Sequence, residues 1–130
     1  MRVYGSQRTK IDNSHNLHKL GIAAQVQLIN VDIHSYKDVF DAIHDSSPDE
    51  IYCLAAQSSV GNSFTNPLDT IKSNTLGTLN ILEACRELNY RGRIFFAGSS
   101  EIFGHQISPA NLNSKVNLKS PYAISKHAGQ

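Results

Sequence analysis

Residues 50–56 read EIYCLAA, a run that is apolar at every position after the first. Residues 93–97 read RIFFA and follow the same pattern. A strand with one wet face alternates apolar and polar side chains, whereas a strand covered on both faces is apolar throughout. We therefore expect both stretches to be strands of a parallel sheet, buried on both faces.

Further strand and helix signals alternate around these two runs. Residues 26–31 predict a strand, and residues 2–5 read as the end of another. Ser35 resembles a helix N-cap with an acid, Asp38, three positions later. A helix with one apolar face should follow it and end near residues 46–48. Residues 17–20 are weakly helical and stop at Gly21, a residue suited to ending a helix.

Two more helices are expected farther along the chain. Residues 57–66 read as a polar loop that leads to Pro67. From there to about residue 89, apolar or small side chains recur at helical spacing, at Leu68, Ile71, Thr75, Leu79, Leu82 and Cys85. After an irregular loop over residues 105–120, Pro121 stands at a plausible start of a last helix over residues 122–130.

Alternating strands and helices with short connections predict an α/β fold. The expected architecture is a Rossmann-type, doubly wound parallel sheet. The 130 residues suffice for one core, so residues 1–130 are expected to form a single domain.

Composition excludes several classes of function. Hydrophobic residues make up 40% and charged residues 18%, the formal net charge is +1, and no basic run suggests a nucleic-acid partner. Neither a membrane span nor a signal peptide is evident, so a cytoplasmic protein is expected. Cys53 and Cys85 read as buried free thiols. The six histidines are scattered, so surface or loop positions are expected for them and no metal site is predicted.

Polar side chains follow the expected strands. Asp32 comes after one strand, Gln57 and Ser58 after the next, and Ser99 and Glu101 after the last. In open parallel sheets, ligands bind beyond the carboxyl ends of the strands. The sequence therefore predicts a ligand site at that edge of the sheet.

Tyr122 and Lys126 form a possible acid–base pair. Side chains four apart share a helix face, and a nearby ammonium favours the phenolate and lowers the phenol pKa. The spacing alone is weak evidence, because a surface Tyr/Lys pair would look the same. Taken singly, Ser99 could be a turn residue and Glu101 a capping or solvated acid. The three features in this order are more specific than any one of them.

Residues 120–126 read SPYAISK, and residues 97–104 read AGSSEIFG. Residues 48–58 read PDEIYCLAAQS, and residues 76–84 read LGTLNILEA. In that order, the four stretches resemble the active-site helix, the catalytic loop, the strand and loop that border the cofactor, and the next helix of the GDP-mannose 4,6-dehydratases, within the extended short-chain dehydrogenases/reductases. The resemblance covers nearly the whole chain, with the motifs in the family's order.

The resemblance implies a reaction in which GDP-mannose becomes GDP-4-keto-6-deoxymannose, with NADP recycled internally. Tyr122 would take the proton of the sugar 4-hydroxyl, and Lys126 would lower the Tyr122 pKa and bind the nicotinamide ribose. Glu101 would remove the C5 proton, and Ser99 would hydrogen-bond the oxygen at C4. Sugar 4-epimerases lack the acid at the position of Glu101, which favours dehydration.

The resemblance also implies a cofactor-binding set. Asp32 and Ile33 would meet the adenine. Arg8 lies where an arginine suits the 2′-phosphate of NADP, although a solvated loop charge fits it equally and NAD stays possible. The nucleotide and nicotinamide side would be lined by Leu54, Ala55, Ala56, Gln57 and Ser58. Asn74 matches a family position with a structural role, and full-length relatives are expected to be homo-oligomers.

The chain departs from the family pattern in three places. The first strand with its Gly-rich turn and the carboxyl-terminal substrate domain have no counterpart, and Asp69 stands where relatives often have a cofactor-contacting tyrosine. Without the first strand an apolar sheet edge should be exposed. This chain alone is therefore expected to be poorly stable, to bind cofactor weakly and to be inactive. The alternatives are a UDP-sugar 4-epimerase, another extended dehydrogenase, or a non-catalytic truncated Rossmann module.

Overall fold

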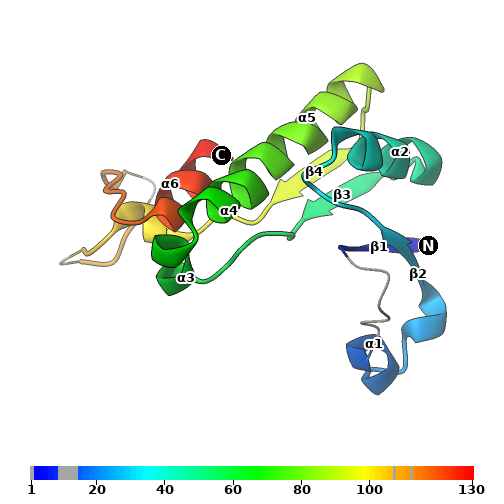
Figure 1. The fold of residues 1–130 in the computed structure, drawn as a ribbon, viewed down its shortest axis with the longest axis horizontal. Coiled ribbons are helices and arrows are strands. Elements are labelled where there is room, and N and C mark those ends of the chain that lie inside the picture. Colours follow the sequence, from blue (N-terminus) through cyan, green and yellow to red (C-terminus); the bar gives the residue numbers. More distant parts are fainter. Residues whose placement is uncertain (1, 9–14, 107, 112) are drawn as a thin grey trace.

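The part of the chain that the structure describes contains four short parallel strands (Figure 1). The structure is a computed structural model, and it describes residues 2–8, 15–106, 108–111 and 113–130. The strands are β1 (Val3–Gln7), β2 (Val26–Asn30), β3 (Glu50–Cys53) and β4 (Arg93–Phe96). All four expected strands are present, so the predicted α/β class with parallel strands is confirmed.

Helices and turns occupy the connections. The order is α1 (His15–Lys19), η1 (Ala23–Gln25), α2 (Tyr36–Ser46), α3 (Val60–Thr65), α4 (Pro67–Ile71), η2 (Lys72–Leu76), α5 (Gly77–Glu87), η3 (Ser100–Phe103) and α6 (Pro121–Ala128). The predicted N-cap of α2 is confirmed, since Ser35 Oγ accepts a hydrogen bond from the backbone N–H of Asp38. Gly21 also ends α1 as predicted, with a φ of 69°. Part of the polar stretch expected after β1, residues 9–14, lies outside the described residues.

The strands form two separate pairs. In one pair β1 lies beside β2 with Val3 opposite Val26, and in the other β3 lies beside β4 with Glu50 opposite Arg93. No described strand connects β1 with β3, and Figure 1 shows the two pairs standing apart. The expected sheet is therefore present as two parallel ladders, each of two strands.

One face of the β3–β4 pair is covered by α2 and α5. Cys53 packs there with Val39 and Ile43 of α2 and with Ile81 and Ala84 of α5. The other face is open: Tyr52 and Phe95 are 62% and 51% exposed, and their rings lie tilted against each other with centroids 5.8 Å apart. The prediction that both strands are buried on both faces is therefore wrong, because no described element covers the second face.

The long helix after Pro67 differs from the prediction in two ways. It is α4, the π-helical turn η2 and α5 in succession, and the backbone N–H of Gly77 bonds to the carbonyl of Lys72, five residues back. Its buried face also differs from the predicted one, because Leu68, Leu79 and Leu82 are exposed. The buried face carries mainly polar residues, together with three apolar ones near its end. These residues are Thr70, Ser73, Asn74, Thr78 and Asn80, followed by Ile81, Ala84 and Cys85.

Internal hydrogen bonds explain how this polar face can be buried. Thr70 donates to the carbonyl of Asn66 and Thr78 donates to that of Asn74, at 2.9 and 2.7 Å. A buried hydroxyl that is bonded in this way loses little on leaving water. The periodicity therefore predicted the helix correctly. The residues that it predicted to be buried lie about one position after those that are buried.

Smaller differences concern the loops. The loop expected at residues 57–66 contains α3, whose first turn is capped by Ser59. Both apolar runs form shorter strands than expected, because the ladder ends at the pair Cys53 and Phe96. Cys53 and Cys85 are buried free thiols, as predicted, and burial raises the pKa of both.

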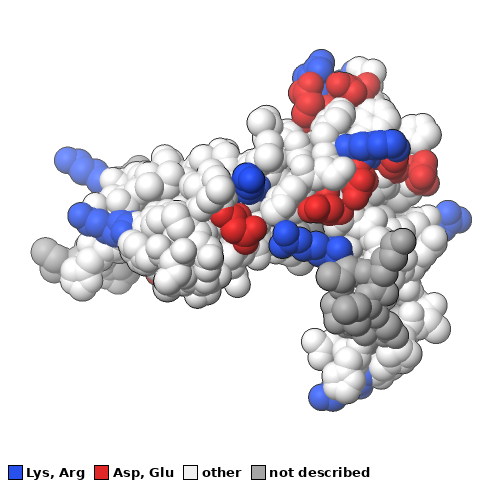
Figure 2. Space-filling view, in the orientation of Figure 1, with Lys and Arg blue, Asp and Glu red and all other residues white. Residues whose placement is uncertain are grey.

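Charged side chains of both signs are interspersed on the face shown in Figure 2, where they gather over α2 and the end of α5. Pairs such as Arg86 with Glu83, at 2.6 Å, lie in this region. The surface over α3, α4 and α6 is mostly uncharged in this view. In the part of the chain that the structure describes, no helix is both long and apolar enough to span a membrane.

The observed buried face of α5 can be tested with two substitutions. Ile81→Ala should lower the free energy of unfolding by about 2–4 kcal/mol, because Ile81 is 8% exposed and the substitution leaves a cavity. Leu79→Ala should change it by only about 0.5 kcal/mol, because Leu79 is 58% exposed. Urea unfolding of the two variants measures both values. A larger loss for Leu79→Ala would show that the predicted face was right.

Candidate active site at the carboxyl ends of the strands

The last helix reaches the carboxyl end of β4 through a buried lysine. Lys126 is 4% exposed, and its Nζ donates a 2.7 Å hydrogen bond to the carbonyl of Ala97, the residue after β4. Helix α6 also packs against α3, α4, η2 and η3. This bond places the last turn of α6 at the carboxyl end of β4, where a ligand of a parallel sheet is expected.

Local sequence explains why α6 begins where it does. Ser120 Oγ accepts a 3.0 Å hydrogen bond from the backbone N–H of Ala123, and Pro121 occupies the first turn, where its missing N–H costs nothing. Tyr122 is 8% exposed and lies four residues before Lys126. The sequence predicted that the two side chains share a helix face but did not predict that both are buried.

The Lys126 ammonium lies beside an aromatic ring and a thiol, those of Phe96 and Cys53. It lies 4.8 Å from the centroid of the Phe96 ring, which favours a cation. Burial nonetheless lowers the pKa of Lys126, and the neighbouring Cys53 thiol opposes this shift. The Phe96 ring also packs on Gly129, where an added Cβ would lie 2.7 Å from the ring. A glycine at position 129 thus lets Phe96 sit beneath the ammonium.

A buried amide joins three segments of the site. Asn74, in η2, is 2% exposed. Its Oδ1 accepts from the backbone N–H of Gln57 at 2.9 Å, and its Nδ2 donates to the Gln57 carbonyl at 3.1 Å and to Ser125 Oγ at 2.9 Å. Ser125 in turn donates to the carbonyl of Tyr122 at 2.8 Å. The loop after β3 and the helix carrying Tyr122 are therefore held by one side chain.

Ser99 and Glu101 lie on the turn that follows β4. Ser99 caps η3, and its Oγ accepts a hydrogen bond of 3.3 Å from the backbone N–H of Glu101. Because the oxygen accepts, the hydroxyl hydrogen remains available for another acceptor. Glu101 is exposed, and η3 packs against α6. The structure thus brings the elements that carry Ser99, Glu101, Tyr122 and Lys126 together.

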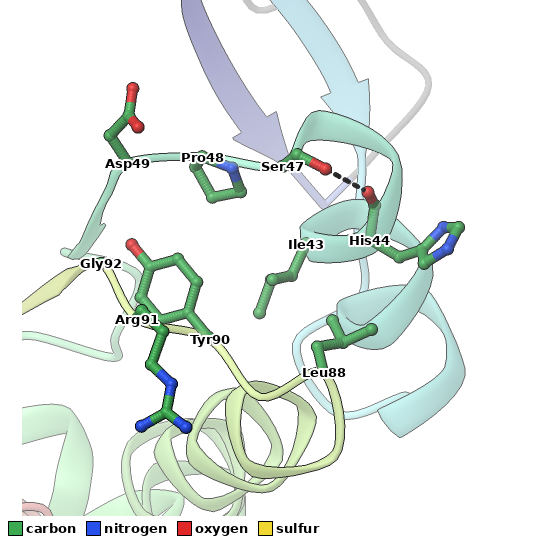
Figure 3. Close-up of a pocket in the computed structure, with 9 residues that line it drawn as sticks. All are labelled: Ile43, His44, Ser47, Pro48, Asp49, Leu88, Tyr90, Arg91 and Gly92. Carbon is green, nitrogen blue, oxygen red and sulfur yellow. Dashed lines mark hydrogen bonds between the residues drawn. The ribbon is translucent and has the colours of Figure 1, made fainter.

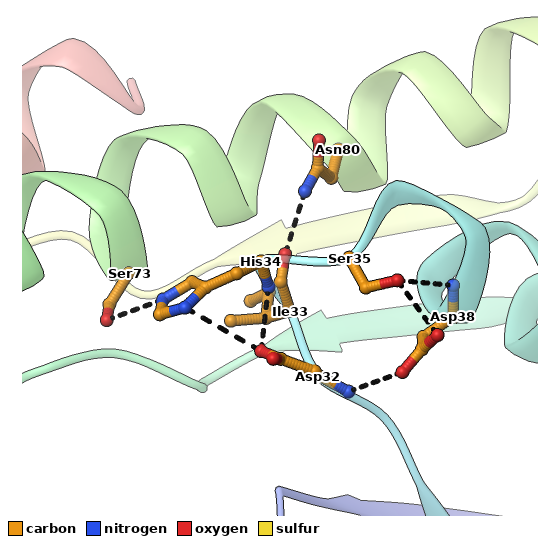
Figure 4. Close-up of polar contacts among 7 residues, drawn as sticks. All are labelled: Asp32, Ile33, His34, Ser35, Asp38, Ser73 and Asn80. Carbon is orange, nitrogen blue, oxygen red and sulfur yellow. Dashed lines mark hydrogen bonds and ion pairs between the residues drawn. The ribbon is translucent and has the colours of Figure 1, made fainter.

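The segment after β2 is fixed by hydrogen bonds to its neighbours (Figure 4). Asn80 Nδ2 donates to the carbonyl of Ile33 at 2.8 Å, and the backbone N–H of Asp32 donates to Asp38 Oδ2 at 3.2 Å. The hydrogen bond from Ser35, followed by that from the backbone N–H of Asp32, lowers the pKa of Asp38. An added Cβ on Gly77 would lie 2.7 Å from the Ile33 side chain. The close packing of α5 on Ile33 therefore needs a glycine.

Each of the remaining predicted cofactor residues follows the carboxyl end of a strand. Arg8 follows β1 directly, beside the end of β2, because the backbone N–H of Val31 donates to the carbonyl of Gln7 at 2.9 Å. Beyond β3, Leu54, Ala55 and Ser58 are exposed, and Ala56 and Gln57 are half-buried. The side-chain oxygen of Gln57 is buried and accepts no hydrogen bond from any residue that the structure describes.

A cavity of about 500 Å³ lies elsewhere, at the opposite end of the β3–β4 pair (Figure 3). It opens where α2 and α5 end and β3 and β4 begin. It is lined by Ile43, His44, Ser47, Pro48, Asp49, Leu88, Tyr90, Arg91 and Gly92. None of these residues belongs to the predicted set, and the cavity lies at the amino ends of the strands, away from Gln57 and Ala97.

Sequence reasoning did not identify three polar residues near the carboxyl ends of the strands, namely Ser125, His34 and Ser73. Ser125 lies within the active-site helix, but its bond to Asn74 joins residues 51 positions apart. His34 was expected only as a surface or loop histidine, yet its ring meets Ser73 at 3.0 Å. Such pairings depend on the fold and carry no local signal. Among the described residues, no three His, Cys, Asp or Glu side chains group in a way that could hold a metal.

Comparison with known proteins shows the family of the chain. A family model described as GDP-mannose 4,6 dehydratase matches residues 1–130. The chain therefore belongs to that family.

Two curated relatives and one solved structure illustrate the range of similarity. A UDP-glucose 4-epimerase of Mycoplasma genitalium is 33% identical over 91% of this chain and 36% of its own length. The GDP-mannose 4,6 dehydratase 1 of Arabidopsis thaliana is 45% identical over 62% of this chain and 24% of its own. A double mutant of the dTDP-glucose 4,6-dehydratase of Streptomyces venezuelae, solved with NAD bound, superposes with a TM-score of 0.84 at 22% identity, over 98% of this chain and 39% of that one. The chain thus spans well under half the length of these proteins.

The role of Asn74 can be tested with an isosteric change. Asn74→Asp keeps the acceptor for Gln57 but loses the donor to Gln57 and Ser125, so it should lower the free energy of unfolding by about 2–3 kcal/mol. Asn62→Asp changes an exposed amide and should have an effect of about 0.5 kcal/mol. Chemical denaturation measures both. Equal effects would contradict the role of Asn74 as the link between the segments.

Proposed function

We propose that this chain carries the catalytic part of a nucleotide-sugar 4,6-dehydratase that acts on GDP-mannose. The observation that supports it best is the meeting of α6, η3 and the loop after β3 at the carboxyl ends of the strands. A phenol, an ammonium, a carboxylate and a hydroxyl are carried by these elements, at Tyr122, Lys126, Glu101 and Ser99. These groups are the ones that the reaction requires.

A nicotinamide dinucleotide fits the residues at this edge. Gln57 offers a buried side-chain oxygen that accepts no hydrogen bond within the described residues, which suits a ligand donor. The Asp32 side chain is 46% exposed and available to the adenosine end. Arg8 is exposed at the end of β1 and suits the 2′-phosphate of NADP. A bound nicotinamide supplies reversible hydride transfer, which no side chain can supply.

The side chains divide the proton transfers between them. Tyr122 takes the proton of the sugar 4-hydroxyl as C4 becomes a ketone. The ketone acidifies the C5 proton, Glu101 removes it, and Glu101 passes that proton to the C6 hydroxyl, which leaves as water. The hydride taken from C4 then returns to C6, while C5 takes a proton from solvent. Ser99 keeps its hydroxyl hydrogen free and donates it to the oxygen at C4. Lys126 has two N–H groups besides the one bonded to Ala97, and these serve Tyr122 and the ribose.

A UDP-sugar 4-epimerase is the second candidate, and the similarity to the Mycoplasma genitalium protein favours it. The two reactions share the oxidation at C4, so Tyr122 and Lys126 would serve both. They differ at C5, where only the dehydratase needs a base. Glu101 on its exposed turn supports the dehydratase.

The two functions separate in heavy water. The native protein, given GDP-mannose in D₂O, should release a 4-keto-6-deoxy product that has lost one water and carries solvent deuterium at C5. Mass spectrometry and NMR detect both changes. An epimerase would interconvert UDP-glucose and UDP-galactose with no solvent deuterium on carbon, and this outcome with no turnover of GDP-mannose would contradict the proposal.

The role of Glu101 has its own test. Glu101→Gln should slow release of the dehydrated product by about 10²–10⁴-fold, the usual contribution of a general base. Glu87→Gln, an exposed acid on α5, serves as the matched control and should keep full activity. Undiminished dehydration by Glu101→Gln would exclude Glu101 as the base at C5.

A further inference from the structure

The ring of His34 joins the segment after β2 to the turn that carries Asn74 (Figure 4). His34 Nε2 lies 3.0 Å from Ser73 Oγ, and its backbone N–H donates to Asp32 Oδ1 at 3.0 Å. The His34 side chain is 20% exposed and Ser73 is buried. This histidine therefore touches both a buried anchor and the carboxylate proposed for the adenosine end of the cofactor.

One arrangement of the His34–Ser73 hydrogen bond also brings the other ring nitrogen to bear on Asp32. If the Ser73 hydroxyl donates to Nε2, the proton of a neutral ring resides on Nδ1. Nδ1 lies 3.7 Å from Asp32 Oδ1, too far for a hydrogen bond but near enough for its partial positive charge to attract the carboxylate. The ring and the backbone N–H of His34 then both face Oδ1. Asp32 Oδ2 is left for a ligand.

The anchor is itself part of the site. Ser73 is adjacent to Asn74 in η2, and Asn74 holds the loop after β3 and the helix of Tyr122. The same turn thus holds the segments that follow β2 and β3. A side chain that joins Asp32 to this turn sets the place of the carboxylate relative to the rest of the site.

We propose that His34 is a positioning residue for the cofactor: anchored by Ser73, it holds the Asp32 carboxylate ready for the adenosine half of a nicotinamide dinucleotide. It acts through Asp32 and takes no part in proton transfer to the sugar. This inference rests on the proposed function, since it assumes that a dinucleotide binds at this edge.

The test compares ligands that contain the adenosine half with one that lacks it. In the native protein, His34→Ala removes the hydrogen bond between the ring and Ser73. It should weaken binding of NADPH and of ADP-ribose by about fivefold, as expected for the loss of one hydrogen bond of ordinary net strength. Binding of reduced nicotinamide mononucleotide should not change. Turnover at saturating cofactor should stay within about twofold, because the lost interaction affects binding alone.

Three variants serve as controls. Ser73→Ala removes the anchor and should show the same separation between ligands. His34→Gln offers an amide oxygen to Ser73 and should recover part of the affinity. His44→Ala removes a histidine of α2 whose side chain is 64% exposed, and should leave all constants unchanged.

Each outcome decides between the inference and its premise. If the wild-type protein binds NADPH and ADP-ribose and His34→Ala binds both equally well, the role of His34 is refuted and the proposed function stands. A uniform loss for all ligands, or a fall in turnover at saturation, would also refute a role confined to the adenosine half. If the full-length native protein binds neither ligand, the proposed function fails and the inference fails with it.

Discussion

The site depends on a single buried amide. Asn74 is almost completely removed from solvent, and each of its polar atoms is bonded, to the backbone of Gln57 and to Ser125. A buried amide is costly unless its donors and acceptor are satisfied, and a satisfied one restricts its surroundings to one arrangement. The loop after β3 and the helix of Tyr122 and Lys126 therefore hold fixed positions relative to each other. The π-helical turn η2 is the element that places this amide, as turns of this kind often do at functional sites.

The elements around Asn74 follow from short-range rules. A serine cap and a proline start α6, a serine cap starts α2, and glycines allow close packing at positions 77 and 129. The last turn of α6 then contains a buried cation, Lys126. The Lys126 ammonium is held there by the Ala97 carbonyl and the Phe96 ring. Packing and chemistry thus share the same residues.

Sequence patterns predicted the elements better than their surroundings. The apolar runs at residues 50–56 and 93–97 predicted two strands correctly. They did not predict that one face is exposed, because the burial of a strand face depends on which other elements pack against it. Helical spacing gave α5, but the buried side carries Asn74 and Thr78 while Leu79 and Leu82 are exposed. A period fixes which residues share a face, not which face is inside when the buried one is polar and internally bonded.

For the site too, the sequence predicted local features but not the contacts between segments. Strand ends predicted that Ser99, Glu101, Asp32 and Gln57 each follow a strand, and helical spacing predicted that Tyr122 and Lys126 share a helix face. The contacts between segments were not predictable, since His34 and Ser73 are 39 residues apart and neither is unusual in its local sequence. The structure also offers a competing location, the cavity beside Tyr90 and Arg91 at the other end of the strands.

Hydrogen–deuterium exchange of the native protein with and without NADPH tests most directly which end of the strands holds the ligand. If the carboxyl ends bind the cofactor, protection should rise in the segments after β2, β3 and β4 and in α6, and stay unchanged around Tyr90. Protection confined to the lining of the cavity, with none near Asp32, Gln57 or Lys126, would contradict the assignment of the site.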